Sequence, residues 1–182
     1  DQAAAAFVKL REDPTVHEPT RTWAGVEAVV ARYLAGESTE ARKEARATYA
    51  HVSTLEEGSP RIGEILSGML EKLPDLPAIP AEDIKNSESD ASHVIAWMLA
   101  GLKNWEQGML EDAAGYFSVV AAVKISDDES WLGVYQNFAK DYLADQKLLS
   151  AGVFDKLPAD AAGCEAAVAE LDAILGKLKT RG

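Results

Sequence analysis

The 182-residue chain contains a single cysteine, only three histidines and no long apolar run. A lone cysteine, Cys164, cannot form an internal disulfide or a cysteine cluster for a metal, and we expect it to be buried packing on a last helix. The apolar stretches, such as residues 119–123, are far shorter than the roughly 18 residues of a membrane-spanning helix. These absences exclude an internal disulfide framework and predict that no segment inserts into a membrane.

Basic residues are also scarce, because 18 Lys and Arg stand against 30 Asp and Glu, which gives a formal net charge of −12 at pH 7. A chain with this charge repels the phosphate backbone of nucleic acids. We therefore expect no nucleic-acid partner, and we expect a protein or peptide partner to be apolar or basic. Hydrophobic residues make up 47% of the chain, which is enough to build a folded core.

No pattern in the sequence indicates a catalytic, cofactor or metal site. His17, His51 and His93 are far apart, and none has a second ligand at the spacing that metal sites on helices use. A glycine-rich phosphate loop and a nucleophile elbow are both missing. Paired acids such as Asp127 and Asp128 are explained by helix capping. We expect a protein that is not an enzyme, while a site assembled only in the fold stays an alternative.

The chain begins Asp-Gln-Ala-Ala, without an initiator Met and without an apolar leader. It is therefore either the product of signal-peptide cleavage or a shortened chain. Between these alternatives we slightly favour an exported protein, periplasmic or secreted, over a cytoplasmic one.

What the sequence does contain is helical periodicity, since apolar residues recur every three or four positions and strict alternation is absent. This pattern predicts an all-α fold of antiparallel helical hairpins. In the first half we expect three helices, which begin near Pro19, at Ser38 and at Ser59-Pro60. The first of them should end near Gly36, because glycine is a common stop signal.

A proline-rich segment follows these helices. Residues 74–90 read PDLPAIPAEDIKNSESD, with three prolines and a polar tail. Such a segment is typical of a linker or a long surface loop. We therefore expect an N-terminal helical subdomain over residues 1–73 and a second helical subdomain over residues 91–182.

In the second half we expect a helix after Asp90, and another that starts at a capping box formed by Ser126 and Glu129. A short helical turn should cover residues 151–157, and a last helix should start near residues 158–160. This last helix carries an apolar stripe that should face a neighbour: Cys164, Val168, Leu171, Leu175 and Leu178.

One stretch of the second half has a distinctive spacing. Residues 96–117 read AWMLAGLKNWEQGMLEDAAGYF and contain, at regular intervals, Trp97, Gly101, Gly108, Ala113 and Phe117. A further tryptophan, Trp131, follows Trp97 by 34 residues. The stretch resembles a tetratricopeptide repeat, a helix-turn-helix unit whose copies stack into a curved solenoid.

The resemblance implies a helical hairpin over residues 94–127 that turns at Gln107-Gly108. Gly101 would lie where the two helices approach closely, with the large Phe117 beside it. A second, degenerate unit would begin at residue 128. Three positions depart from the family pattern, so that a generic helical bundle stays an alternative to a tetratricopeptide-like solenoid: Ala100, Asn104 and Ile125.

The helix over residues 93–106 is apolar nearly all round, which indicates burial on most sides. Met98, Leu102 and Trp105 form one stripe on it, and in a tetratricopeptide array this face would line the concave groove. Either the first-half helices or the segment 74–90 cover the stripe, or a partner's apolar helix or peptide binds it, or the chain self-associates through it.

We expect partial cover, with the exposed edge near Gln136 and Lys140 on the following helix. The candidate partner-binding residues are therefore Met98, Leu102, Trp105, Gln136 and Lys140. These considerations predict a non-enzymatic protein-protein interaction module. A structural subunit of a larger complex is the main alternative, and an enzyme comes third.

Overall fold

The computed structural model describes residues 2–56, 59, 62–75, 91–150, 165–166, 168–169 and 172–173. In this part of the chain every regular element is a helix, which confirms the all-α class. The elements are α1 (Gln2–Glu12), α2 (Thr20–Leu34), α3 (Ser38–Ser53), α4 (Glu64–Lys72), α5 (Ala91–Glu106), α6 (Leu110–Ala122), the 3-10 helix η2 (Asp127–Leu132) and α7 (Gly133–Ser150). None of the described helices is both long and apolar enough to span a membrane.

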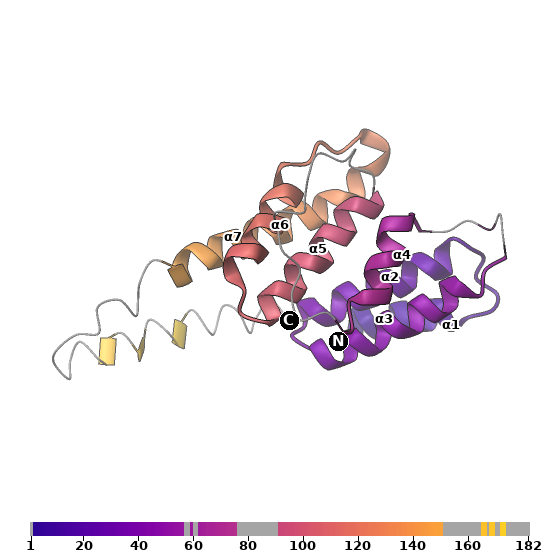
Figure 1. Cartoon of the computed structure of the whole chain (residues 1–182), viewed down its shortest axis with the longest axis horizontal. Coiled ribbons are helices and arrows are strands. Elements are labelled where there is room, and N and C mark those ends of the chain that lie inside the picture. Colours follow the sequence, from indigo (N-terminus) through magenta and orange to yellow (C-terminus); the bar gives the residue numbers. More distant parts are fainter. Residues whose placement is uncertain are drawn as a thin grey trace.

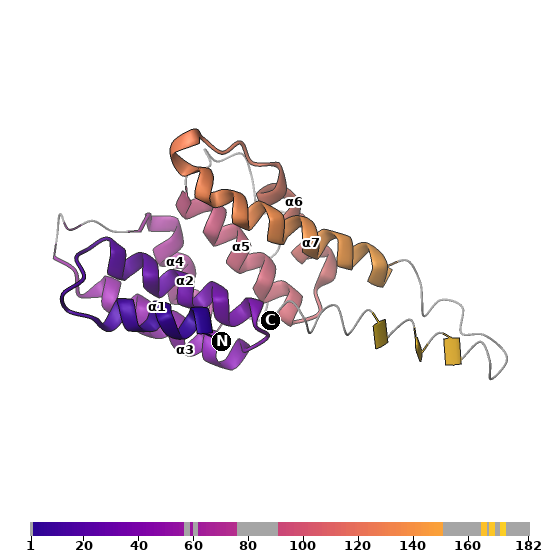
Figure 2. The same ribbon diagram turned by 180° about the vertical axis from the view of Figure 1, so that it is seen from behind.

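Helices that are neighbours in the chain are mostly neighbours in space. Helix α1 packs on α2, α2 on α3, α5 on α6, and α6 on α7. Helix α4 packs against both α3 and α5, so it joins the helices of the first half to those of the second, as Figure 1 shows. Figure 2 shows the same arrangement from behind, with α1 and α7 in front.

The hydrophobic core is shared between the two halves of the chain. Leu66 and Leu70 of α4 belong to the same cluster of buried side chains as Ile95 and Leu99 of α5. The predicted division into two subdomains stays a prediction, because residues 76–90 of the expected linker lie outside the described residues.

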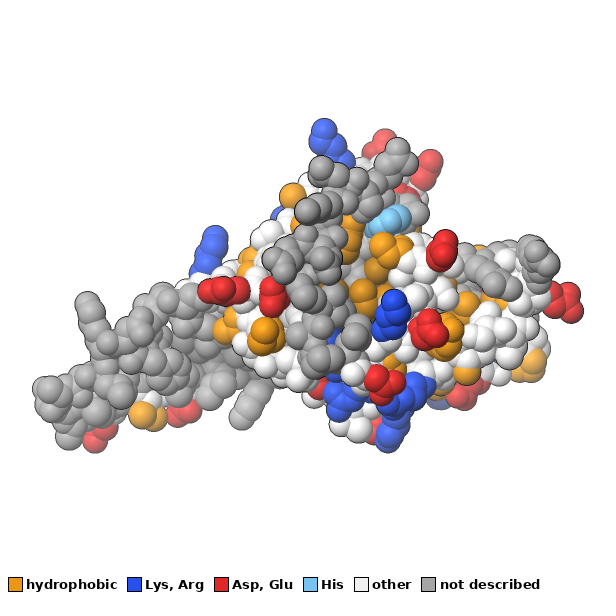
Figure 3. Space-filling view, in the orientation of Figure 1, with side chains coloured by type: hydrophobic (Ala, Val, Ile, Leu, Met, Phe, Trp, Pro, Cys, Tyr) orange, Lys and Arg blue, Asp and Glu red, His pale blue; other side chains and the backbone are white. Residues whose placement is uncertain are grey.

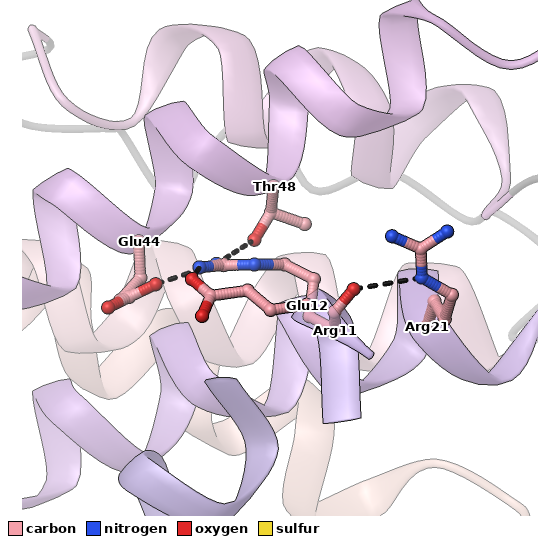
Figure 4. Close-up of polar contacts among 5 residues, drawn as sticks. All are labelled: Arg11, Glu12, Arg21, Glu44 and Thr48. Atoms are coloured by element: carbon pink, nitrogen blue, oxygen red, sulfur yellow. Dashed lines mark hydrogen bonds and ion pairs between the residues drawn. The ribbon is translucent and has the colours of Figure 1, made fainter. Parts of the chain in front are cut away.

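Helix α1 was not predicted. Its alanine-rich sequence favours a helix, but only Ala4 and Arg11 are buried, so it has no apolar stripe that a periodicity analysis could detect. Long-range polar contacts hold its last turn. The Arg11 guanidinium lies 2.6 Å from a carboxylate oxygen of Glu44 and 3.4 Å from the Thr48 hydroxyl, both on α3 (Figure 4).

Helix α2 packs closely against Arg11 and Thr48, and Gly25 of α2 makes this close packing possible. A Cβ atom on Gly25 would lie 2.7 Å from the Thr48 side chain and 3.1 Å from the Cδ of Arg11. The Nε of Arg21 also donates a hydrogen bond to the backbone oxygen of Arg11 over 2.9 Å (Figure 4). Three helices therefore meet around one buried arginine.

Two of the predicted boundaries in the first half have different outcomes. Helix α2 ends at Leu34 and is followed by Gly36 with φ of 73°, so the predicted stop is confirmed. The predicted start at Ser59-Pro60 is wrong, because α4 begins at Glu64. The backbone N–H of Gly63 donates a hydrogen bond to the Ser92 hydroxyl over 3.0 Å, and this contact with α5 fixes the chain just before α4.

The hairpin of α5 and α6 has the predicted form. The turn contains Gly108 with φ of 74°, a left-handed conformation that glycine adopts without steric cost. A Cβ atom on Gly101 would lie 2.5 Å from the Phe117 ring, and Ala113 is fully buried. The close approach of the two helices at Gly101 is therefore confirmed.

The segment after α6 differs from the prediction of one helix that starts at a capping box. The Ser126 hydroxyl donates a hydrogen bond to the Glu129 carboxylate over 3.2 Å, and it caps no backbone N–H. A 3-10 helix follows, in which Glu129 has non-helical backbone angles, and α7 begins only at Gly133.

The expected C-terminal elements lie largely outside the described residues, including the helical turn over 151–157 and Cys164. The described positions from 165 to 173 are helical. Val168 of the predicted apolar stripe is 58% exposed, so the expected contact with a neighbouring helix is wrong at this position.

Candidate partner-binding surface

The apolar stripe of α5 is covered over most of its length. Met98 has no exposed surface and Leu102 is only 3% exposed. Helix α5 packs against α4 and α2 as well as against α6 and α7, and the chain itself buries these two side chains. Neither can contact a partner in this conformation.

Trp105, the third member of the stripe, is half-buried and belongs to an aromatic cluster. Its ring centroid lies 5.0 Å from that of Tyr142 in an edge-on arrangement and 6.3 Å from that of Phe117. The rings of Phe117 and Tyr142 stack at 4.8 Å. These three residues, which we call the Tyr142 cluster, connect α5, α6 and α7.

The two predicted residues on α7 lie near the surface. The Gln136 side chain donates a hydrogen bond to the backbone oxygen of Val123 over 2.7 Å, which ties α7 to the end of α6. Lys140 is exposed. The predicted partner-binding surface therefore reduces to Trp105, Gln136 and Lys140, and its role stays a prediction.

A different surface, which the sequence analysis did not identify, lies where η2 and the start of α7 meet α2. Trp131 and Val134 are exposed to 45% and 49%. The Trp131 ring makes edge-on contacts with Trp23 of α2 and with Tyr135 of α7, with ring centroids 6.1 Å and 6.3 Å apart. We call Trp23, Trp131 and Tyr135 the Tyr135 cluster.

A carboxylate lies at the inner side of the Tyr135 cluster. Glu27, one helical turn after Trp23 on α2, accepts a hydrogen bond from the hydroxyl of the buried Tyr135. Burial raises the pKa of Glu27, although the hydrogen bond from Tyr135 acts in the opposite direction. Burial, together with the Glu27 charge, raises the pKa of Tyr135 well above its usual value, so this hydroxyl stays protonated and donates.

The surface beside Trp131 is acidic. Asp127 and Asp128 are exposed and lie on the same 3-10 helix as Trp131. Residues 125–139 contain no Lys or Arg. The face seen in Figure 3 carries acidic and basic side chains interspersed with small hydrophobic patches.

Two further sets of polar side chains form contacts that connect helices of the fold. Glu18 accepts hydrogen bonds from the backbone N–H and the hydroxyl of Thr22, over 3.1 Å and 2.7 Å, and so caps the start of α2. Its second oxygen lies 2.6 Å from the Nε2 of His51 on α3. Partial burial opposes ionisation of Glu18, but the hydrogen bonds from Thr22 and His51 outweigh it and lower the pKa of the carboxyl.

A second set of charges joins α3 to α5. Arg42 pairs with Glu106, and the nearly buried Lys103 lies 3.7 Å from the other Glu106 oxygen. Burial, with the Glu106 charge, raises the pKa of Tyr33 on α2. These groups connect the two halves of the chain. Neither of the two cationic side chains, Arg42 and Lys103, is fully exposed.

The histidines do not converge. His17 is exposed, His51 pairs with Glu18, and the His93 ring lies 5.7 Å from that of Trp97 on the same helix. Within the described ranges no group of three His, Cys, Asp or Glu side chains could hold a metal ion.

Comparisons with known proteins identify no relative. No protein-family model, no curated protein and no solved structure matches the chain. The tetratricopeptide-like resemblance therefore stays a prediction.

The sequence carried only a weak signal for the Tyr135 cluster. Glu27 and Tyr135 are separated by 108 positions, so no local spacing relates them. The one available indication was an acidic run directly before Trp131, and helix capping explained that run equally well.

Proposed function

We propose that the chain is a non-enzymatic protein-interaction module that binds a basic, partly apolar segment of a partner protein. The observation that carries this proposal is the exposed pair Trp131 and Val134 beside the exposed acids Asp127 and Asp128. Exposed tryptophans are common anchors of protein interfaces, and acids around an anchor attract a basic partner.

Charge complementarity selects this kind of partner over others. The net charge of −12 repels an acidic segment, and it also disfavours a second copy of the same chain. A wholly apolar segment would leave the acids beside Trp131 without a counter-charge. A segment that alternates apolar and basic side chains satisfies both parts of the surface.

The architecture supports an interaction role, because hairpins of packed helices present broad surfaces and need no catalytic residues. We retain the tetratricopeptide-like interpretation as part of this proposal. It is supported by the close contact of Gly101 with Phe117 and by the left-handed turn at Gly108.

The proposal can be tested with a basic amphipathic peptide that carries leucines and arginines, and with an acidic peptide that has the same leucines. Fluorescence anisotropy should show binding of the basic peptide only, with an affinity that falls as salt is added. Trp131→Ala should weaken binding about tenfold or more, as expected for an interface anchor. Met109→Ala is the matched control, because Met109 is also 45% exposed but lies at the α5–α6 turn.

Three results would reject the proposal. The first is that neither peptide binds, and the second is that Met109→Ala weakens binding as much as Trp131→Ala. The third is that the chain is a dimer in solution and Trp131→Ala makes it a monomer. In that case the surface joins two copies, and the assembly-subunit alternative takes first place.

A further inference from the structure

The environment of Glu27 differs from that of three other partly buried carboxylates, each of which pairs with a basic side chain. Glu44 pairs with Arg11, Glu106 with Arg42, and Glu18 with His51. Glu27 accepts a hydrogen bond from the Tyr135 hydroxyl, and within residues 2–56, 62–75 and 91–147 no cationic side chain forms an ion pair with it.

A half-buried carboxylate without a counter-cation is energetically unfavourable. Removal from water destabilises an anion, and a single neutral donor compensates only part of that cost. The raised pKa of Glu27 has the same cause. A cation that reached this carboxylate would therefore gain more from the contact than it would from an exposed acid.

The aromatic rings near Glu27 are also suited to binding a cation. Trp23 precedes Glu27 by one turn of α2, and Trp131 contacts both Trp23 and the Tyr135 that binds Glu27. Tryptophan has the strongest attraction of the aromatic side chains for a cation over its ring face. Because Trp131 is 45% exposed, part of its ring is open to a partner.

We propose that the Tyr135 cluster and Glu27 together form a receptor for one cationic side chain of the partner segment. The cation lies against the exposed part of Trp131 and pairs with the Glu27 carboxylate, while Trp23 and Tyr135 hold these two groups in place. This inference rests on the proposed function and deepens it, because it names the side chain that the surface selects.

An arginine fits this receptor better than a lysine. A guanidinium is planar, so it can stack on an indole ring and still direct N–H groups at a carboxylate. It is also more weakly hydrated than an ammonium, which lowers the cost of bringing it to a half-buried acid. Asp127 and Asp128 then act at longer range and attract the partner without fixing its register.

The test compares the basic amphipathic peptide, reduced to a single arginine, with the same peptide that carries citrulline at that position. Citrulline has nearly the shape of arginine but no charge. With the wild-type protein we expect the citrulline peptide to bind about tenfold more weakly, and the lysine peptide to lie between the two.

The protein side of the test uses Glu27→Gln, which keeps the size of the side chain and removes its charge. In this variant the arginine and citrulline peptides should bind within about twofold of each other, as a double-mutant cycle requires when the two groups interact directly. Asp141→Asn is the matched control, since Asp141 is an exposed acid of α7, and it should leave the tenfold difference intact.

Each outcome separates this inference from the proposed function. If the peptide binds through Trp131 but the arginine preference persists in Glu27→Gln, the receptor assignment is wrong and the interaction module stands. If no peptide binds the wild-type protein, both fall together. Thermal melts of each variant confirm that it is folded, and the citrulline comparison on the wild-type protein needs no variant at all.

Discussion

The Tyr142 cluster and the Tyr135 cluster lie two helical turns apart on α7, and each places a tyrosine of that helix against a tryptophan from another element. They differ in how much of their aromatic surface is exposed. Phe117 of the Tyr142 cluster is fully buried, whereas Trp131 of the Tyr135 cluster is 45% exposed, although Tyr135 itself is buried. The first cluster is therefore closed to solvent at Phe117, and the second is open at Trp131.

The two clusters also differ in their polar groups. The Tyr135 hydroxyl binds Glu27, so the open cluster combines one exposed tryptophan ring with a carboxylate that has no cationic partner among the described residues. A packing cluster does not need this arrangement, because a half-buried charge weakens folding. The comparison therefore indicates that the two clusters should respond differently to mutation.

The largest effect is expected in the hairpin that supports the Tyr142 cluster. Gly101→Leu forces a side chain into the Phe117 ring, which would lie 2.5 Å from the new Cβ, and should lower the free energy of unfolding by about 3 kcal/mol or more. Gly68→Leu is the control, because no atom lies within 4 Å of its Cβ position and leucine favours a helix. Chemical denaturation measures both, and an equal effect would mean that Gly101 is not at a tight crossing.

A smaller effect is expected from the tryptophans themselves. Trp105→Ala removes a half-buried ring that contacts Phe117 and Tyr142, and should destabilise the chain by more than about 2 kcal/mol. Trp131→Ala should cost less than about 1 kcal/mol, since nearly half of that side chain is already in water. If Trp105→Ala melts within a degree of wild type, the contrast between the closed and the open cluster disappears.

The hairpin that supports the closed cluster was largely accessible from the sequence because its determinants are local. Gly101, Gly108 and Phe117 lie within one hairpin, where helical periodicity and a glycine turn fix both the pairing and the contact. The open cluster depends on contacts between α2 and η2 or α7, and sequence spacing within one hairpin carries no information about such contacts.

Helix α1 and the start of α4 were missed for the same reason. The buried side chain that holds the end of α1 is an arginine, and its partner Glu44 lies 33 positions away, so an analysis of apolar periodicity does not detect it. The start of α4 is displaced from Ser59-Pro60 because Gly63 binds Ser92 on α5. In both cases the position of a helix depends on a long-range polar contact, which the local sequence pattern does not reveal.

The smallest effects concern the pH dependence of folding, where the carboxylates of Glu18 and Glu27 should act in opposite directions. The pKa of Glu18 is lowered, so its stabilising contribution is present above the unfolded value of about 4.3 and is lost as the pH falls through the folded value. Glu18→Gln should therefore melt below wild type at neutral pH, and the difference should shrink in acid.

Glu27 should show the reverse. Its pKa is raised, so the folded state favours the protonated form, and the stability that this provides is lost as the pH rises through the folded value. Glu27→Gln mimics the protonated form at every pH, and its amide oxygen can still accept the Tyr135 hydrogen bond. We expect this variant to melt close to wild type in acid and above it at neutral pH. Melting temperatures of both variants across the acid-to-neutral range test the pair together. A Glu27→Gln variant that melted below wild type at neutral pH would mean that its charge stabilises the fold, and Glu27 would then belong with the paired carboxylates rather than with an open receptor.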